Sequence, residues 1–436
     1  MTTNGTKVAV DASRIKSGGG IAHLKAILNV QDLSSHGISE LHVWSYRELL
    51  DQLPDRPWLI KHCPSVSTKS LVHQIIWQAT RLAKEIKTTG CEVLFSVDAT
   101  TFCNFQPMVV LHQNMIPFEK GFDQLYGFRL SDIHQRVLRL VQIRAFRRAT
   151  AVIFLTHYAA ERTQLFTGAL KNIRCIAHGV DEAFKHDLTK ATWPEDNERP
   201  IKCLYVSPLW KYKHQAEVVR AIKILRDRGY DANLTLTGGG NKEGKALLAH
   251  QLQITDSDRN FVTVLDFVAH HQIPELIASA DIFVFASSVE TFGITLLEGM
   301  TVGVPIACSS ASSLPETLQD GGIYFDPKDE KSIANAVQSL IDDPLLRAQL
   351  IERSQQLALA YSWQKCSTQT WAYVVETCNQ LSPKRLRPKL SPIGAVILLV
   401  AALASAYYIL SPFRSCLRTS PDTPHAQAEC VRTTQW

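Results

Sequence analysis

Short apolar segments alternate with helix-length segments along most of the chain, and no other feature limits the possible folds as strongly. In the first part, strands are expected at 7–13, 41–46, 92–97, 108–113 and 151–156, and helices at 21–35, 69–87 and 128–148. The alternation starts again at 201. Most of these strands are apolar along their whole length, which is typical of parallel strands covered by helices on both faces. The pattern therefore predicts two α/β domains of the Rossmann-like type.

A polar stretch at 183–200 separates the two halves of this pattern. It contains two prolines and shows no hydrophobic period, which indicates a linker. We therefore expect an N-terminal domain at 1–182, a C-terminal domain at 201–360 and a helix at 361–382 that crosses back to the first domain. In open α/β sheets, ligands bind beyond the carboxyl ends of the strands. Two such sheets are expected to face each other across one cleft.

The last part of the chain, 383–436, differs in composition from the rest. Its segment 393–410 has no charged residue, and as a helix it would span about 27 Å, close to the thickness of a hydrocarbon core. Four basic residues precede this segment closely, and Arg414 and Arg418 follow it. A buried core helix is the alternative, but such a helix seldom lacks a polar face. The pattern predicts one membrane span, with the larger N-terminal part in the cytoplasm.

The distribution of charge along the chain argues against a nucleic-acid partner. The chain has 46 Lys and Arg and 41 Asp and Glu, a formal net charge of +5. The tail after 382 carries seven basic and two acidic residues, which account for the whole excess. Because the rest is neutral, no nucleic-acid partner is expected. The ten cysteines have no metal-binding spacing, and the N-terminus does not resemble a secretory signal peptide.

The most informative stretch is 281–310, where a buried strand is expected to lead into a helix that begins near Thr291 or Phe292. Glu290 would then lie just before the helix and Glu298 on it. The first backbone N–H groups of a helix have no partner within it, so they can bind anions or hydroxyl groups. A carboxylate beside such donors suits a polyhydroxyl ligand. The alternative is that Glu290 caps the helix and Glu298 is a surface residue.

Glu290 and Glu298 are separated by seven residues, and the pattern E-x-F-G-x-x-x-L-E-G-M around them resembles the E-x7-E motif of retaining glycosyltransferases, in particular family 4. The resemblance covers residues 7–380. It implies a two-domain GT-B fold, a nucleotide-sugar donor in the cleft, retention of the anomeric configuration, and neither a metal nor another cofactor. It also implies that Glu298 holds the ribose of the nucleotide and that Glu290, as a catalytic residue, holds hydroxyls of the donor sugar. The backbone beside Glu290 would contact the donor as well, at Thr291, Phe292 and Gly293.

Further positions match the family in the same order along the chain. Gly19 and Gly20 follow the first strand and precede a helix, where glycines let the backbone approach a donor phosphate or sugar. A plain flexible turn is the alternative. His112 ends the strand at 108–113, and in similar enzymes a histidine at this point is catalytic and contacts the donor sugar. The alternative is an ordinary histidine.

Lys213 matches a lysine that the family aims at the donor diphosphate. The family usually has an arginine five residues before this lysine, and the present sequence has Pro208 there. Lys211 could take its place, but a lysine cannot form the bidentate contact of an arginine. The group of cations around the diphosphate therefore departs from the family pattern.

Three other features have plain structural explanations. Residues 239–246 resemble a P-loop but lack its Ser or Thr, so ATP or GTP hydrolysis is not expected. Asp342 and Asp343 precede a proline and are expected in a loop at the end of a helix, not at a metal site. The helix at 128–148 carries six arginines, which would either face solvent or contact anionic lipid headgroups or a lipid-phosphate acceptor.

Together these features predict a membrane-anchored, retaining glycosyltransferase of the hexosyltransferase class, acting in polysaccharide biosynthesis. It would transfer a sugar from a nucleotide-diphosphate sugar to a glycan or lipid-linked acceptor. A GT-B sugar-nucleotide epimerase and a non-catalytic sugar-nucleotide-binding membrane protein are the alternatives. Release of free nucleotide without an acceptor product would favour the epimerase.

Overall fold

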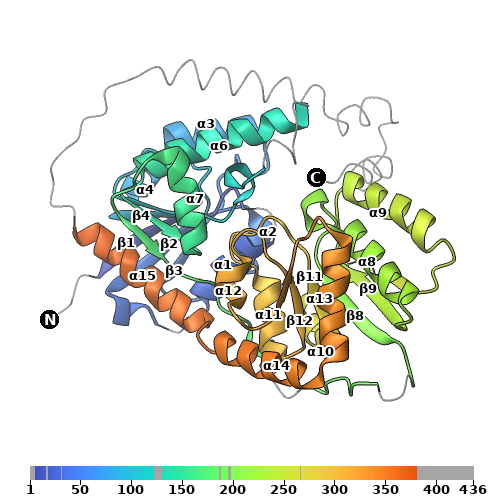
Figure 1. The fold of residues 1–436 in the computed structure, drawn as a ribbon. Coiled ribbons are helices and arrows are strands. Elements are labelled where there is room, and N and C mark those ends of the chain that lie inside the picture. Colours follow the sequence, from blue (N-terminus) through green and yellow to red (C-terminus); the bar gives the residue numbers. More distant parts are fainter. Residues whose placement is uncertain are drawn as a thin grey trace.

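The computed structural model describes most of the two predicted domains. The described residues are 5–15, 18–30, 32–121, 130–185, 188–194, 198–265 and 267–380. Ser17 and the predicted span at 393–410 lie outside them. No helix among the described residues is long and apolar enough to cross a membrane. This part of the chain forms two α/β domains, each built on a parallel sheet (Figure 1).

The N-terminal sheet has seven strands in the order β3-β2-β1-β4-β5-β6-β7. They are β1 (Thr6–Asp11), β2 (Ile38–Trp44), β3 (Leu59–His62), β4 (Val93–Ser96), β5 (Met108–Leu111), β6 (Ala151–Phe154) and β7 (Ile173–Cys175). The inner strands β4, β5 and β6 are buried at every residue, in agreement with their apolar sequences. The predicted strands omit β3 and β7, because these short edge strands are partly exposed and include charged residues.

The helices of this domain are shorter than their sequence patterns suggest. They are α1 (Gly19–Leu28), α2 (Arg47–Leu50), α3 (Leu71–Trp77), α4 (Ala83–Thr88), α6 (Leu130–Arg148) and α7 (His157–Thr167). The single helix expected at 69–87 is interrupted by a π-helical turn, η2 (Gln78–Leu82). There the buried side chain of Gln78 donates to Asp11 Oδ2 over 2.8 Å. Short 3-10 turns include η1 (Ser34–His36), η3 (Ile116–Phe118) and η4 (Glu182–Phe184).

The C-terminal sheet has six parallel strands in the order β10-β9-β8-β11-β12-β13. They are β8 (Ile201–Val206), β9 (Ala232–Thr237), β10 (Val262–Leu265), β11 (Ile282–Phe285), β12 (Ile306–Ser309) and β13 (Ile323–Phe325). The helices are α8 (Gln215–Asp227), α9 (Lys242–Thr255), α10 (Ile273–Ala278), α11 (Ile294–Val302), α12 (Leu314–Leu318), α13 (Glu330–Asp342) and α14 (Pro344–Ala358), with 3-10 turns η5 (Lys211–Lys213) and η6 (His270–Gln272).

The strand order of each sheet defines where a ligand can bind. In the N-terminal sheet the order reverses between β1 and β4, and in the C-terminal sheet it reverses between β8 and β11. At such a switch point the loops after the two central strands diverge and leave a crevice. The glycine turn after β1 and the loop from β11 to α11 therefore lie at the two switch points.

The last described helix, α15 (Trp363–Asn379), packs against the N-terminal domain (Figure 1). Trp371 is fully buried, its ring meets Phe95 edge to face, and its Nε1–H donates to the backbone oxygen of Ile27 over 2.9 Å. Ser367 donates to the same oxygen over 3.0 Å. The chain thus returns from the C-terminal domain to the first one.

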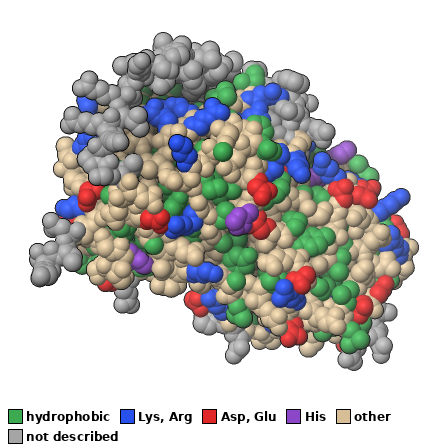
Figure 2. Space-filling view, turned by 60° about the vertical axis from the view of Figure 1, so that its left-hand side comes forward, with side chains coloured by type: hydrophobic (Ala, Val, Ile, Leu, Met, Phe, Trp, Pro, Cys, Tyr) green, Lys and Arg blue, Asp and Glu red, His purple; other side chains and the backbone are tan. Residues whose placement is uncertain are grey.

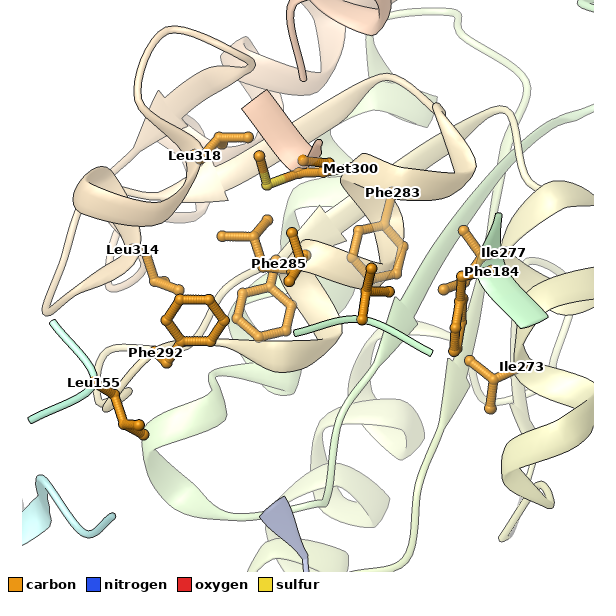
Figure 3. Packing of buried hydrophobic residues seen from close by; sticks show 14 of the residues in the cluster. Leu155, Phe184, Ile273, Ile277, Phe283, Phe285, Phe292, Met300, Leu314 and Leu318 are labelled. Atoms are coloured by element: carbon orange, nitrogen blue, oxygen red, sulfur yellow. The ribbon is translucent and has the colours of Figure 1, made fainter. Parts of the chain in front are cut away.

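Phe292 joins the hydrophobic cores at the junction of the two domains. Figure 3 shows its ring close to Leu155, which follows β6, and to Leu314 of α12, and all three side chains are buried. The ring also stacks on His178, with 5.6 Å between the ring centroids. The helix that was expected to begin at Thr291 or Phe292 begins later, at Ile294, because Gly293 adopts a left-handed conformation just before it.

Candidate functional site

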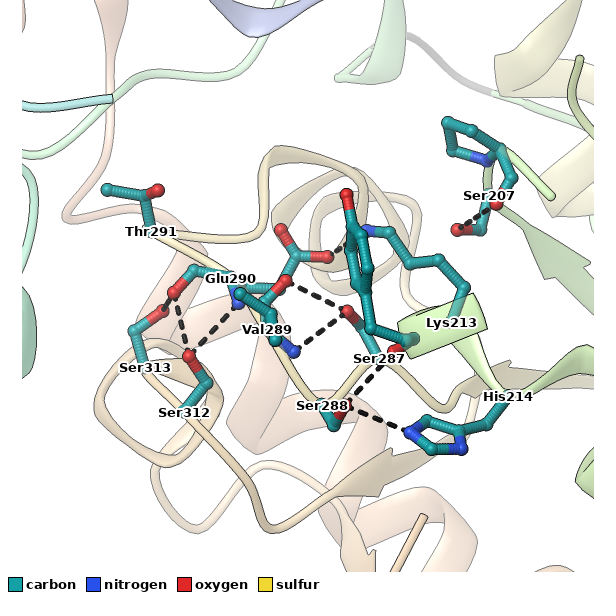
Figure 4. Close-up of polar contacts among 12 residues, drawn as sticks. Ser207, Lys213, His214, Ser287, Ser288, Val289, Glu290, Thr291, Ser312 and Ser313 are labelled. Atoms are coloured by element: carbon teal, nitrogen blue, oxygen red, sulfur yellow. Dashed lines mark hydrogen bonds and ion pairs between the residues drawn. The ribbon is translucent and has the colours of Figure 1, made fainter. Parts of the chain in front are cut away.

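The loop from β11 to α11 is the centre of the candidate site. Gly293 has φ +90° and ψ 61°, a left-handed conformation that glycine adopts without steric cost, so the chain can turn sharply before α11. The hydroxyl of Ser287 stabilises the loop, because it donates to the oxygen of Val289 over 3.1 Å (Figure 4). The first N–H groups of α11 point out of the helix at this turn, because they have no partner within it.

Glu290 and Lys213, which the sequence predicts at the donor site, form an ion pair in the structure (Figure 4). Lys213 lies in the turn after β8, and its side chain is 9% exposed; that of Glu290 is 16% exposed. The ammonium group also lies 5.3 Å from the centre of the Tyr212 ring. Because a buried charge without a partner is costly, the opposite charges of the two side chains compensate each other at this loop.

Glu298 lies in the second turn of α11 and pairs with His270. The distance from His270 Nε2 to Glu298 Oε1 is 3.2 Å; the Glu298 side chain is 7% exposed and that of His270 is 64% exposed. The hydrogen bond with Glu298, together with its negative charge, raises the pKa of His270 above the ordinary value. His270 belongs to none of the motifs that the sequence shows. Its only sequence signal is its place after β10, at the carboxyl edge of the second sheet.

The glycine turn of the N-terminal domain lies against this loop. A Cβ atom on Gly19 would be 3.4 Å from Cδ1 of Ile294, the first residue of α11. A Cβ atom on Gly20 would come within 2.9 Å of Gln113 Oε1, closer than a side chain tolerates. The structure therefore brings Gly19 together with the start of α11, although the two lie far apart in the sequence.

His112 is not in contact with the other predicted residues. Its ring is fully buried and meets the rings of Phe118, Phe146 and Phe154 edge to face. Nε2 lies 3.0 Å from the oxygen of Asn114, and Nδ1 has no hydrogen-bond partner among the described residues. Burial lowers the pKa of His112 to about 4, so the ring is neutral at pH 7.

Thr291 connects the loop to the N-terminal domain by two hydrogen bonds. Its hydroxyl donates to the oxygen of Gln113 over 3.1 Å, directly after His112, and its own oxygen accepts from Thr156 Oγ1 over 3.0 Å. Glu316 of α12 adds a third contact, because its carboxylate accepts from the backbone N–H groups of His157 and Tyr158 over 2.7 and 2.8 Å. These amides form the N-terminus of α7, where a negative charge is favourable.

The two remaining motifs have structural roles. Asn241 caps α9, since its side chain accepts from the N–H of Gly244 over 2.8 Å, so the P-loop-like residues form an ordinary helix start. Asp343 caps α14 through the N–H of Leu346, and Asp342 accepts from the Tyr230 hydroxyl. No group of three or more His, Cys, Asp or Glu that could hold a metal ion occurs in the described part of the chain.

The arginines of α6 are partly engaged within the domain. Arg147 donates to the oxygen of Thr167 over 2.9 Å, Arg139 lies 5.0 Å from the centre of the Phe166 ring, and Arg144 lies 5.5 Å from that of Phe102. Figure 2 shows Lys and Arg side chains gathered near the top of the molecule, where Figure 1 places α6. The helix therefore contributes both packing and positive charge.

Comparison with known proteins finds relatives of the C-terminal domain. Residues 190–357 match the family model of group 1 glycosyl transferases. O-antigen chain mannosyltransferase B of Escherichia coli is 39% identical over 121 residues, which are 28% of this chain and 32% of that protein. Alpha-D-kanosaminyltransferase of Streptomyces kanamyceticus is 30% identical over 231 residues, which are 50% of this chain and 57% of that protein. The chain thus spans less than two thirds of the length of these relatives.

Solved structures share the arrangement of both domains. Sucrose-phosphate synthase from Thermosynechococcus elongatus has a TM-score of 0.70 and 14% identity, and the match covers 86% of this chain and 100% of that chain. Anabaena Alr3699/HepE in complex with UDP and glucose has a TM-score of 0.64 and 18% identity, with the same coverage. The fold is therefore of the GT-B type. Within it, the residues that match the model of group 1 glycosyl transferases include the whole of the six-stranded C-terminal sheet.

The pair of His270 and Glu298 predicts a pH dependence. A raised histidine pKa means that the stabilisation from this pair is present below the ordinary pKa of histidine and is lost as the pH rises through the raised value. We expect the His270 pKa, measured by NMR titration of its ring protons, to lie above the ordinary value and to fall in Glu298→Gln, which removes the charge. Glu352→Gln, which removes an exposed carboxylate of α14 that is not part of this pair, should leave the titration unchanged. An unaltered His270 pKa in Glu298→Gln would contradict the pairing.

Proposed function

We propose that the protein is a retaining glycosyltransferase that transfers a hexose from a nucleotide-diphosphate sugar to a glycan or lipid-linked acceptor. The observation that carries this proposal is the buried pair of Lys213 and Glu290 at the loop that begins α11. A cation and a carboxylate side by side, next to helix N–H groups, match a ligand that carries both a diphosphate and sugar hydroxyls. The names of the relatives support the class, since one is a mannosyltransferase and a solved neighbour contains UDP and glucose.

In this proposal the C-terminal domain, 201–360, binds the donor and the N-terminal domain, 1–182, binds the acceptor. The linker at 183–200 joins them, and the helix at 361–382 returns to the first domain. Glu298 accepts hydrogen bonds from the ribose hydroxyls, and His270 lies beside it with most of its side chain open to solvent. Glu290 accepts from hydroxyls of the donor sugar, while the backbone at Thr291, Phe292 and Gly293 donates to the ligand.

The chemical step requires stabilisation of the charge on the leaving diphosphate. Lys213 has three N–H groups, one of which is used by Glu290, and the remaining ones can donate to phosphate oxygens. The amides at the start of α11 supply further donors that need no reorganisation. Gly19 lies opposite Ile294, and its lack of a side chain would let the backbone approach the donor, while Gly20 lies against Gln113. We propose a front-face displacement, because no residue at the site is placed as a nucleophile by resemblance or motif. His112 would contact the sugar through Nδ1, which has no hydrogen-bond partner among the described residues.

The two glutamates are expected to affect different steps. Glu290→Ala should lower kcat by about 100-fold, because contacts with the sugar strengthen as charge develops at the anomeric carbon. It should not weaken the affinity for free nucleoside diphosphate, since that ligand lacks the donor sugar and Lys213 loses its neutralising partner. Glu298→Ala should weaken binding of the nucleoside diphosphate by about 1–3 kcal/mol.

Calorimetric titration with UDP and GDP, together with steady-state kinetics, measures these effects. Glu352→Ala on α14 is the matched control and should behave like wild type in both assays. If Glu290→Ala and Glu298→Ala both bind nucleotide normally and retain full turnover, the assignment of the two glutamates is wrong.

We also propose that the reaction needs no metal ion, as the resemblance to family 4 implies. The negative charge of the diphosphate would be met by Lys213 and by helix N–H groups. Turnover is therefore expected to persist in excess EDTA at the rate measured without it. A complete loss of activity that added Mg²⁺ restores would exclude this proposal, and the diphosphate would then require a cation that the protein does not supply.

The membrane is the third part of the proposal, and it depends on the uncharged segment 393–410. A chain that ends at Ser382 keeps the whole of α15 and should remain in the supernatant after ultracentrifugation. The full chain should sediment with membranes and resist washing with carbonate, because an uncharged segment of this length favours the hydrocarbon core. Release of the full chain by carbonate or high salt would leave only peripheral binding.

A further inference from the structure

Ser312 adopts a backbone conformation that a residue with a side chain rarely occupies. Its φ is +58°, in the left-handed region, where the Cβ atom of an L-amino acid is crowded. The residue lies in the short connection between β12 and α12, across from the loop that holds Glu290 (Figure 4). A glycine would adopt this conformation without strain, so the serine needs an explanation in its hydroxyl group.

The hydroxyl of Ser312 connects the Glu290 peptide with the other domain. Oγ lies 3.0 Å from the N atom of Glu290, from which it accepts, 2.8 Å from the oxygen of Glu290, and 2.6 Å from Oε2 of Glu119. A hydroxyl has one proton to donate. The shorter distance and the carboxylate acceptor favour donation to Glu119. Ser312 therefore accepts from the N–H of Glu290 in the loop from β11 to α11 and donates to Glu119 of the N-terminal domain.

Glu119 is held in place from its own side. It follows the turn η3 after β5, and it is 5% exposed. Oε1 accepts from the hydroxyl of Tyr158 and from the N–H of Lys120, while Oε2 accepts from Ser312. No ion pair of Glu119 occurs among the residues that the structure describes. Its fixed oxygens thus define where the Ser312 hydroxyl, and through it the Glu290 peptide, must lie.

We propose that Glu119 and Ser312 are positioning residues that orient the Glu290 peptide when the two domains meet. This inference rests on the proposed function, since the oriented peptide carries the carboxylate that would hold the donor sugar. The bridge is not needed to keep the domains together, because Thr291 and Glu316 make separate contacts with the N-terminal domain. Loss of the bridge should therefore change the catalytic step more than folding or nucleotide binding.

The decisive variant is Ser312→Gly, which removes the hydroxyl and relieves the backbone strain. We expect kcat to fall about tenfold or more, because small displacements of a catalytic group are costly. The affinity for free UDP or GDP should stay within about twofold of wild type, and the melting temperature should not decrease, because glycine tolerates the left-handed conformation. A residue with a merely structural role would not lower kcat while the stability is maintained.

Three further variants locate the effect in the bridge. Glu119→Ala should lower kcat as Ser312→Gly does, and the double variant should be no worse than either single one, because both remove the same contact. Glu119→Gln keeps an oxygen that can accept from Ser312 and should recover most of the activity. Ser313→Ala is the matched control: its hydroxyl also donates to the oxygen of Glu290, over 3.0 Å, but among the described residues it forms no hydrogen bond with the N-terminal domain.

Hydrogen exchange measured by mass spectrometry gives a readout that does not depend on turnover. The N–H of Glu290 donates to Ser312, so the peptide that covers 289–293 should exchange faster in Ser312→Gly and in Glu119→Ala, but not in Ser313→Ala. Wild-type kcat and wild-type exchange in Ser312→Gly, or an equal loss of activity in Ser313→Ala, would overturn the inference. If the wild-type protein transfers no sugar from any nucleotide donor, the proposed function fails, and the exchange experiment alone decides whether the bridge exists.

Discussion

The sharp turn at Gly293 is the constraint on which the candidate site depends. The chain leaves a fully buried strand, β11, and must enter α11 within eight residues, so the loop has to reverse direction before the helix begins. The left-handed conformation of Gly293 makes this possible. As a result, Glu290 lies beside Lys213, Phe292 is turned into the core at the domain junction, and Ile294 at the start of α11 lies next to Gly19 of the other domain. A different turn would separate these groups.

The charges at the site occur as pairs, and this has a consequence for ligand binding. Lys213 is paired with Glu290, and Glu298 with His270, so that each buried charge has a partner. A ligand with a diphosphate and several hydroxyls can share these partners without leaving any of them unpaired. The fold keeps one buried cation, Lys213, directly at the loop.

The residues that join the two domains could not be predicted from the sequence, unlike the residues of the motif. Glu290, Glu298 and Lys213 could be proposed from a motif, because their spacing along one strand-loop-helix unit and one turn is visible in the sequence. Glu119, Ser312 and Glu316 could not, because Glu119 and Ser312 meet across 193 positions and have no local pattern. His112 could be proposed from its place at the end of a strand. Its surroundings of three phenylalanine rings come from segments that only the folded domain brings together.

The sequence by itself determined the class of fold and the sheet edges at which the candidate loops lie. Apolar strands that alternate with helices must form parallel sheets, and parallel strands place all their carboxyl ends on one edge, where the loops with Gly19 and Glu290 follow. It did not determine the edge strands β3 and β7, which lack an apolar run, or the start of α11. The tertiary structure decided which side chains meet between the two domains, such as Glu119 and Ser312. Such pairing depends on the relative position of two separately folded sheets, and local periodicity contains no information about that position.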